Sequence, residues 1–331
     1  MLRGMSLKLL WRVVLRTGIV FVLVYAIFHV LSPVFGVGRY HSSARGSIAL
    51  AFAAVACVGL PWAAIPGARA LKPVGTMARQ LRYVSLLSAA VGLVVASAAI
   101  YASRAQRDVL GEVVQSSAWF RQLVLSCIVG GFVGMAADVL SRDERDMRPT
   151  SLLLFAVLGL GGGLSWAYGL LPPLVGAVGG VWLINATLRR MDIVELTQQS
   201  SDFFNGLLLV SVGAAMGFAR GATGSLALVV VLGGLAFFAA RLLGNIVGSN
   251  VGTRLARLPG DRPRWLFGVA LLPQGGLTIA VAITVKQAVP DAWFAIVLVN
   301  VLLTQILCPY LLAQLLHSTG AGKERTPTPA P

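Results

Sequence analysis

The sequence predicts an all-α polytopic membrane protein with about ten transmembrane helices. Of its 331 residues, 57% are hydrophobic and only 12% are charged, whereas a soluble domain carries roughly 25% charged residues. The mean hydropathy is +0.81. The apolar residues fall in runs of about 20, which is the length that a helix needs to cross a bilayer. Transmembrane β-strands would instead alternate over about ten residues, and these runs do not alternate.

Ten apolar runs are expected to cross the membrane. They cover residues 13–35, 47–66, 83–102, 122–140, 151–171, 174–188, 203–219, 225–244, 265–286 and 292–316. The sixth run is short and follows Pro172 and Pro173, so a tilted or partial crossing is predicted there. Residues 1–317 would form one transmembrane domain. Residues 318–331 are rich in Gly, Thr and Pro and have no apolar face, which predicts a disordered tail.

The Lys and Arg residues lie mainly in every second gap between these runs, on the side of the N-terminus, whose own segment contributes Arg3, Lys8, Arg12 and Arg16. The positive-inside rule then places both termini in the cytoplasm of a cell whose inner or plasma membrane holds the protein. Because the basic residues are spread over short gaps, the net charge of +15 does not indicate a nucleic-acid partner. The three Cys residues lie inside apolar runs and are interpreted as small buried hydrophobes. No metal cluster, cofactor site or pairing of a nucleophile with a base is visible, so an enzyme is not expected.

One stretch, residues 265–286, organises the chain. It is about one membrane crossing long, yet Pro273, Gln274, Gly275 and Gly276 interrupt it. Proline removes a backbone donor and clashes with the preceding turn, and the glycines add backbone freedom. Unwound backbone at membrane depth is tolerated where protein buries it or where it lines a watery cavity. Secondary transporters use such broken helices as substrate sites; the alternative is a kinked helix whose neighbours satisfy the freed groups.

A second crossing, residues 47–66, is interrupted in the same way at Gly59, Leu60 and Pro61. On the predicted topology it enters the membrane from outside, whereas the crossing at 265–286 enters from the cytoplasm. Two broken helices of opposite direction are typical of an inverted repeat, with the site where they cross. Coincidence is the alternative, because Gly and Pro are common in membrane helices.

The C-terminal half resembles the end of monovalent cation:proton antiporters, the sodium/hydrogen exchanger-like family. The run FFAARLLGNIVGS (237–249) and the run RPRWLFGVALLPQGGLTIAVAI (262–283) carry the resemblance. In that family a basic residue in a Gly-rich helix precedes a broken helix with a Gln-Gly-Gly-like centre. Upstream, GLLPPLVGAVGGVWLINATL (169–188) and SSDFFNGLLLVSVGAAMGF (200–218) are similar to two further family segments.

In the N-terminal half, ALAFAAVACVGLPWAAI (49–65) resembles the first broken helix of the family, and residues 81–101 resemble the helix that follows it. The resemblance covers roughly residues 47–316. It implies a core of crossed broken helices that moves against a dimerisation scaffold. About three N-terminal helices of the family, which form much of that scaffold, have no counterpart here, so the family's usual homodimer is not implied.

The chain departs from the family at its coupling site. The family's helix after the first break carries a carboxylate pair or an Asn-Asp pair, which would fall near Leu93 and Val94 here. A carboxylate suits proton coupling because burial can bring its pKa near neutral. No acidic residue lies in the middle of a predicted crossing. Asp138 is the nearest candidate, and its place at a helix end favours an interfacial role.

Arg241 is a basic residue inside the predicted crossing 225–244. An intramembrane ionisable residue is a functional hypothesis, with snorkelling to the interface as the alternative. Arginine stays charged at any relevant pH, so Arg241 cannot carry a coupling proton. It could join the two broken helices through carbonyls at their ends, or bind an anion. Polar residues on one side of the last helix are expected to face the break at Gln274, unless they only join helices: these are Asn300, Thr304 and Gln305.

These observations predict a secondary transporter that resembles a monovalent cation (Na⁺ or K⁺):proton antiporter, with atypical or lost proton coupling. The alternative is a transport-inactive relative that serves as a membrane scaffold or accessory subunit. A third possibility keeps the fold and binds an anion at Arg241. The partners expected are the lipid bilayer, a monovalent cation and a proton, or an anion, together with a second copy of the chain or a membrane partner subunit.

Overall fold

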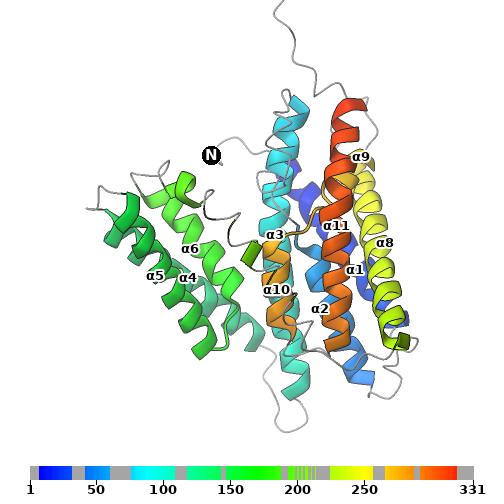
Figure 1. The fold of residues 1–331 in the computed structure, drawn as a ribbon, viewed down its shortest axis with the longest axis horizontal. Coiled ribbons are helices and arrows are strands. Elements are labelled where there is room, and N and C mark those ends of the chain that lie inside the picture. The colour runs from blue at the N-terminus through cyan, green and yellow to red at the C-terminus, as the bar shows by residue number, and fades with distance from the viewer. Residues whose placement is uncertain are drawn as a thin grey trace, which may run out of the picture.

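The structure is a computed structural model, and the part of the chain that it describes is helical (Figure 1). It describes residues 7–31, 42–59, 76–108, 118–142, 147–187, 193–197, 224–255, 265–286 and 291–318, with isolated positions between 200 and 213. The helices are α1 (Leu7–Leu31), α2 (Ser42–Cys57), α3 (Thr76–Asp108), α4 (Ala118–Ser141), α5 (Met147–Ala167), α6 (Pro172–Ala186), α8 (Gly224–Leu255), α9 (Trp265–Ala270), α10 (Gly276–Lys286) and α11 (Asp291–Ser318).

The predicted fold class is confirmed at the level of an apolar, all-helical protein. Within the described residues, five helices are long and apolar enough to cross a membrane, and they lie in α1, α3, α4, α5 and α8. Shorter apolar helices cover most of α2, α6, α10 and α11. Each predicted crossing overlaps a described helix except 203–219, most of which lies outside the described residues. The ten crossings and the inverted repeat remain predictions.

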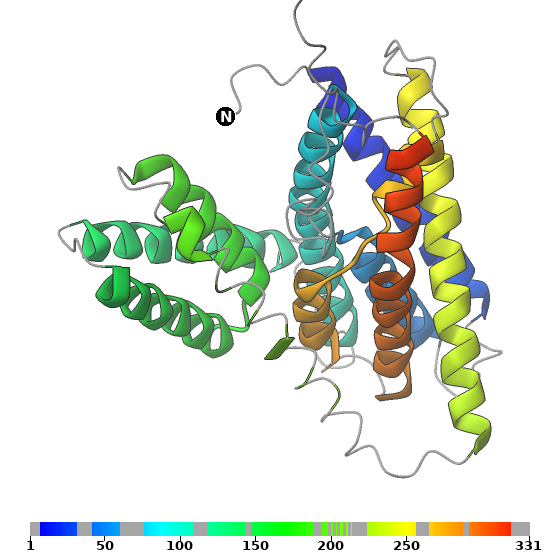
Figure 2. The ribbon, with the colours of Figure 1, turned by 45° about the horizontal axis from the view of Figure 1, so that its top comes forward.

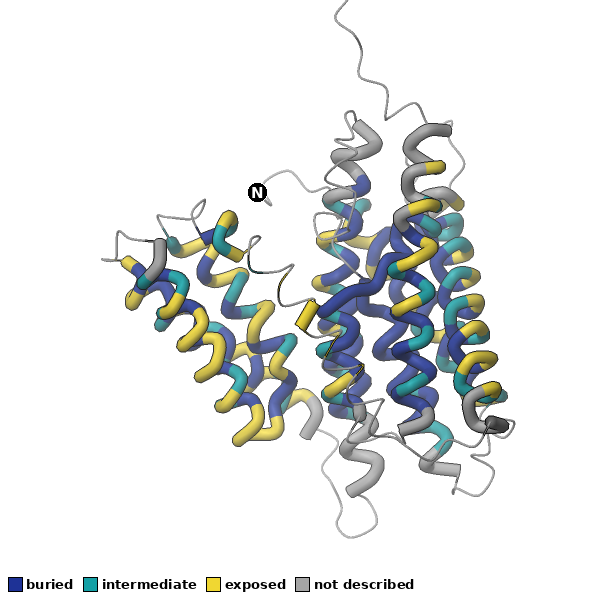
Figure 3. Tube along the Cα trace, viewed as in Figure 1, coloured by how far each residue is buried: buried dark blue, intermediate teal, exposed yellow. Residues whose placement is uncertain are grey.

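Two groups of helices lie side by side in the molecule (Figures 1 and 2). The larger group contains α1, α2, α3, α8, α9, α10 and α11, and most of its buried core belongs to one hydrophobic cluster. The smaller group, α4 to α6, has a second cluster, although Leu174 of α6 belongs to the first. Figure 3 shows that buried residues are concentrated in the middle of the larger group, whereas exposed residues recur along the helices of the smaller group. The larger group therefore holds the candidate site.

Helices α1 and α8 pack antiparallel over a stripe of glycines. Gly244 and Gly248 lie one turn apart on α8 and contact Val20 and Arg16 of α1, and Gly252, one turn further on, contacts Arg12. A Cβ atom at Gly248 would lie 2.8 Å from Cγ of Arg16 and 3.1 Å from its Cα. Small residues of this kind let two membrane helices approach closely. The stripe thus fixes α8, and with it Arg241, against α1.

The structure corrects three expectations about individual residues. Arg16 lies inside α1 and is buried, as is Arg12, although both were counted with the cytoplasmic N-terminal segment. Cys127 is exposed on α4, so only Cys57 and Cys308 are buried hydrophobes. Ser318 is the last residue of α11 rather than the first of the tail, and residues 319–331 lie outside the described residues.

Gly92 brings α3 into backbone contact with the end of α2, and its replacement by alanine is expected to separate the two helices. A Cβ atom there would lie 2.2 Å from the carbonyl oxygen of Cys57, a clash that only backbone movement can relieve. We expect Gly92→Ala to lower the free energy of unfolding by about 1–3 kcal/mol, measured as a fall in the thermal midpoint in detergent. Gly131→Ala on α4 is the matched control, because nothing lies within 4 Å of its added methyl group. An equal midpoint for the two variants would contradict the close contact.

Candidate functional site

Two interrupted helices meet in the middle of the larger group. Helix α9 ends at Ala270, residues 271–275 are not helical, and α10 begins at Gly276, so the predicted break is present. Helix α2 ends at Cys57, and Val58 and Gly59 are not helical. Leu60 and Pro61, the rest of the second predicted break, lie outside the described residues. Helices α2 and α9 approach from opposite ends of the bundle (Figure 1).

The two ends touch at Gly59. A Cβ atom on Gly59 would lie 3.7 Å from the carbonyl oxygen of Leu271 and 3.9 Å from that of Pro273. It would also lie 4.0 Å from Nη2 of Arg241. The segment after α2, the segment after α9 and the middle of α8 therefore converge on one point.

Arg241 joins the two helix ends through their backbone carbonyls. Its side chain is 1% exposed. Nε donates to the carbonyl of Ala56 (2.9 Å) and Nη2 donates to that of Val58 (3.2 Å), both at the end of α2. Nη1 donates to the carbonyl of Leu272, after the end of α9. One planar guanidinium, with five N–H donors in a fixed arrangement, thus satisfies acceptors from both chain segments.

The electrostatics of the junction favour a cation at this position. The last carbonyls of a helix have no partner within the helix, and they carry the negative end of its dipole. The ends of α2 and α9 both point at Arg241, so two negative helix ends face one positive charge. Because these carbonyls use a donor on each of its three nitrogens, the geometry favours the role of joining the helices over the binding of an anion at Arg241.

Gln274 connects the break to α2 and to α11. Its Nε2 lies 3.2 Å from the carbonyl oxygen of Val55 and 3.3 Å from that of Val58. Its Oε1 accepts a hydrogen bond of 2.5 Å from Nδ2 of Asn300. Its own backbone carbonyl accepts a hydrogen bond of 2.5 Å from Nε2 of Gln305. The structure therefore places Asn300 and Gln305 against the break.

Three carbonyls of the unwound backbone, those of Val58, Leu272 and Gln274, accept hydrogen bonds from side chains. The carbonyl of Val58 also accepts a hydrogen bond from Oγ1 of Thr278 (3.2 Å). The amide groups of Thr278 and Ile279 donate to the carbonyl of Gly275, at 2.9 Å and 3.1 Å, which starts α10. Residues 271–276 are all buried. A broken backbone can persist in a membrane under these conditions.

Other residues of the site behave differently from the expectation or were not foreseen. Thr304 is buried, but its hydroxyl donates to the carbonyl of Val301 in its own helix (2.8 Å) and not to the break. Asn245 was missed; its Nδ2 donates to the carbonyl of Arg241 (2.9 Å) from one turn further along α8. Thr278 was also missed. Its place one turn after the Gly-Gly pair is the signal that could have indicated it.

The positions of the missing carboxylate pair are occupied by apolar contacts. Leu93 of α3 is buried in the hydrophobic core and Val94 is exposed. Within the described part of the chain, the one buried carboxylate is that of Asp138 on α4. It forms an ion pair of 3.1 Å with Arg142 at the end of the same helix. Asp138 therefore has a local partner, as expected of an interfacial residue.

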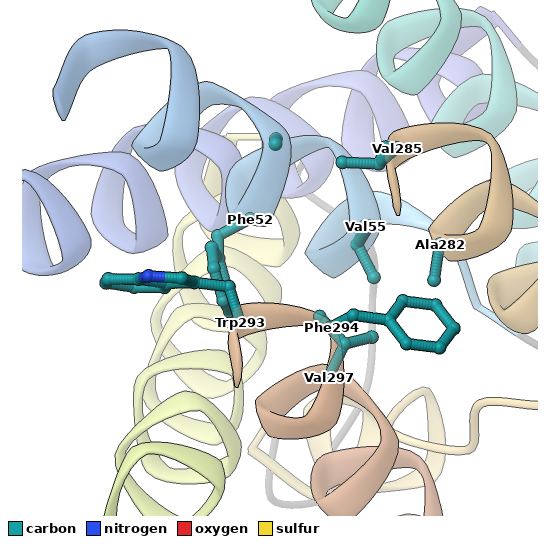
Figure 4. Close-up of a pocket in the computed structure, with 8 residues that line it drawn as sticks. Phe52, Val55, Ala282, Val285, Trp293, Phe294 and Val297 are labelled. Atoms are coloured by element: carbon teal, nitrogen blue, oxygen red, sulfur yellow. The ribbon is translucent and has the colours of Figure 1, made fainter. Parts of the chain in front are cut away.

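A small pocket next to the junction is apolar. It lies between α2, α10 and α11 (Figure 4), and its lining residues are Ala51, Phe52, Val55, Ala282, Val285, Trp293, Phe294 and Val297. The rings of Phe52 and Trp293 pack edge to face with centroids 5.2 Å apart. No side chain in this lining offers an oxygen ligand, so the pocket has none of the groups that bind an alkali cation.

No protein-family model matches the chain, and none of the curated proteins matches it. The resemblance to cation:proton antiporters therefore depends on the sequence segments quoted above.

Proposed function

We propose that the chain is a multi-pass membrane protein of the inner or plasma membrane and a secondary transporter built on crossed, interrupted helices. The meeting of the ends of α2 and α9 at Arg241 and Gln274 carries this proposal. Transporters place substrate sites at such breaks because unwound carbonyls can coordinate an ion. A monovalent cation is the proposed substrate class, in line with the resemblance to cation:proton antiporters.

Proton coupling, in this proposal, does not use a carboxylate in the core. Arg241 supplies a permanent charge in place of a titrating group, and no carboxylate lies beside it among the described residues. A cation that reaches the carbonyls of Val58 or Leu272 would have to displace donors of Arg241, Gln274 or Thr278. Transport would then require the junction to open, with the α2 and α9 ends moving apart.

The second candidate is a relative that does not transport and serves as a membrane scaffold or accessory subunit. One observation favours it: the carbonyls of Ala56, Val58 and Leu272 already accept hydrogen bonds from side chains. A junction that is satisfied in this way holds the two helices together without any ion.

A flux assay separates the two candidates. We expect proteoliposomes of the purified chain to dissipate an imposed pH gradient when Na⁺ or K⁺ is added, read with an entrapped pH-sensitive dye. Gln274→Met should abolish the response, and Arg254→Met, an exposed position on α8, should leave it unchanged. A response equal to that of empty liposomes for every monovalent cation would overturn the transporter proposal. Stable co-purification of a membrane partner would then support the scaffold.

A further inference from the structure

A second buried arginine, Arg16 of α1, makes none of the hydrogen bonds of the junction and has donors without acceptors. Its side chain is 5% exposed. Nη2 donates to Oγ of Ser88 on α3, whereas Nε and Nη1 have no hydrogen-bond partner. On the opposite side, Gly248 of α8 packs against its Cα and Cγ atoms. Arg16, which belongs to α1, thus contacts α3 through Ser88 and α8 through Gly248.

The charge of Arg16 is not compensated by the protein. It forms no ion pair in the described structure, and the titratable groups that act on it electrostatically are Arg241, the thiol of Cys57 and Arg12. A buried charge without a partner is very costly, and an ionisable side chain inside a membrane helix is usually paired or lines a functional site. A negative charge near Arg16 would remove this cost.

Two hydroxyl groups of this region have protons that can be donated. The hydroxyl of Ser88 accepts from Arg16, so its own proton can be donated elsewhere. Thr17, the next residue of α1, is 1% exposed and its hydroxyl has no partner. Excess N–H and O–H donors around an uncompensated guanidinium suit an anion and oppose a cation.

We infer that Arg16, with Ser88, binds a small monovalent inorganic anion of halide size. The burial of Arg16 between α1, α3 and α8 restricts the ligand to a small ion, because a lipid head group would need an open path to the surface. The ion would neutralise the charge that α1 carries into the bundle. Neither Arg16 nor Ser88 takes part in the hydrogen bonds of the junction at Arg241, and the site does not depend on transport.

Equilibrium binding of radiolabelled chloride to the purified full chain in detergent tests the site. We expect saturable binding of about one chloride per chain that bromide displaces and gluconate does not. Arg16→Met should abolish it, and Ser88→Ala should weaken it about tenfold, the effect of one hydrogen bond to a charged group. Arg254→Met, exposed on α8, should bind as the unmodified chain does.

Two results would overturn the inference. One is the absence of saturable chloride binding to the unmodified chain, and the other is equal binding by the Ser88→Ala and unmodified chains. Should Arg16→Met fail to fold, Arg16→Lys replaces it, because it keeps the charge and loses the fork of donors; it should bind chloride less tightly. Equilibrium binding does not require flux, so chloride binding can be detected even if the chain has no transport activity.

Discussion

Arg241→Met is expected to destabilise the protein more than any other single substitution of a polar side chain in the bundle. Methionine matches the length of the arginine stem but has no donors, so the buried carbonyls of Ala56 and Leu272 lose their side-chain partner, while that of Val58 keeps the donors of Gln274 and Thr278. An unsatisfied buried acceptor costs about 1–3 kcal/mol, whereas hydrogen bonds between membrane helices average about 0.6 kcal/mol. Removal of the buried charge itself offsets part of the loss. We therefore expect a net loss of about 2–4 kcal/mol.

The thermal midpoint in detergent measures this loss, and a fall of at least about 5 °C is expected. Arg241→Lys keeps the charge but not the planar fork of donors, so its midpoint should lie between those of Arg241→Met and the unmodified chain. Arg254→Met is the control on the same helix, because its side chain is exposed, and its midpoint should not move. Equal midpoints for Arg241→Met and Arg254→Met would show that the three hydrogen bonds contribute nothing.

Gln274→Met is expected to have the second largest effect, about 1–3 kcal/mol. The substitution preserves the size of the side chain and removes the donor to the carbonyls of Val55 and Val58, together with the acceptor for Asn300. Asn300 is fully buried and its Oδ1 already has no partner, so its whole amide would be orphaned. Gln305→Met should cost less, because Gln305 is only partly buried and makes one hydrogen bond to the break.

A double-mutant cycle on Gln274 and Asn300 measures the hydrogen bond between their side chains. The hydrogen bond to Gln274 is the contact that Asn300 Nδ2 makes in the described structure, so the double variant Gln274→Met with Asn300→Leu should cost less than the sum of the two single variants. Gln122→Met on α4, outside the junction, serves as the control. Simple additivity of the two single effects would contradict a direct bond between the side chains.

The break in residues 265–286 was predictable because Pro and paired Gly act on the local backbone, whatever surrounds them. The grouping of Asn300 and Gln305 with Gln274 was predictable as well, since helical spacing puts both on one side of α11. The sequence also offered the joining of carbonyls as one of two roles for Arg241. The sequence alone does not decide between joining carbonyls and binding an anion. The outcome depends on where α2 ends relative to α8, and that position is set by tertiary packing.

Arg16 was missed for a related reason. A basic residue near the start of the first apolar run fits a cytoplasmic flank, and the count of Lys and Arg treated it as one. The signal lay in two periodic patterns read together: Arg12, Arg16 and Val20 recur every four residues on α1, as do Gly244, Gly248 and Gly252 on α8. Only their antiparallel contact shows that the arginines enter the bundle.

The most direct test of the central claim is an experimental structure of the chain in a lipid nanodisc, inspected at Arg241. We expect the helix to be interrupted over residues 271–275, and the guanidinium to lie within hydrogen-bond distance of the carbonyl oxygens of Ala56, Val58 and Leu272. A continuous helix through Pro273 and Gly276, or a guanidinium that points to the membrane surface, would contradict the account of both the junction and the function proposed for it.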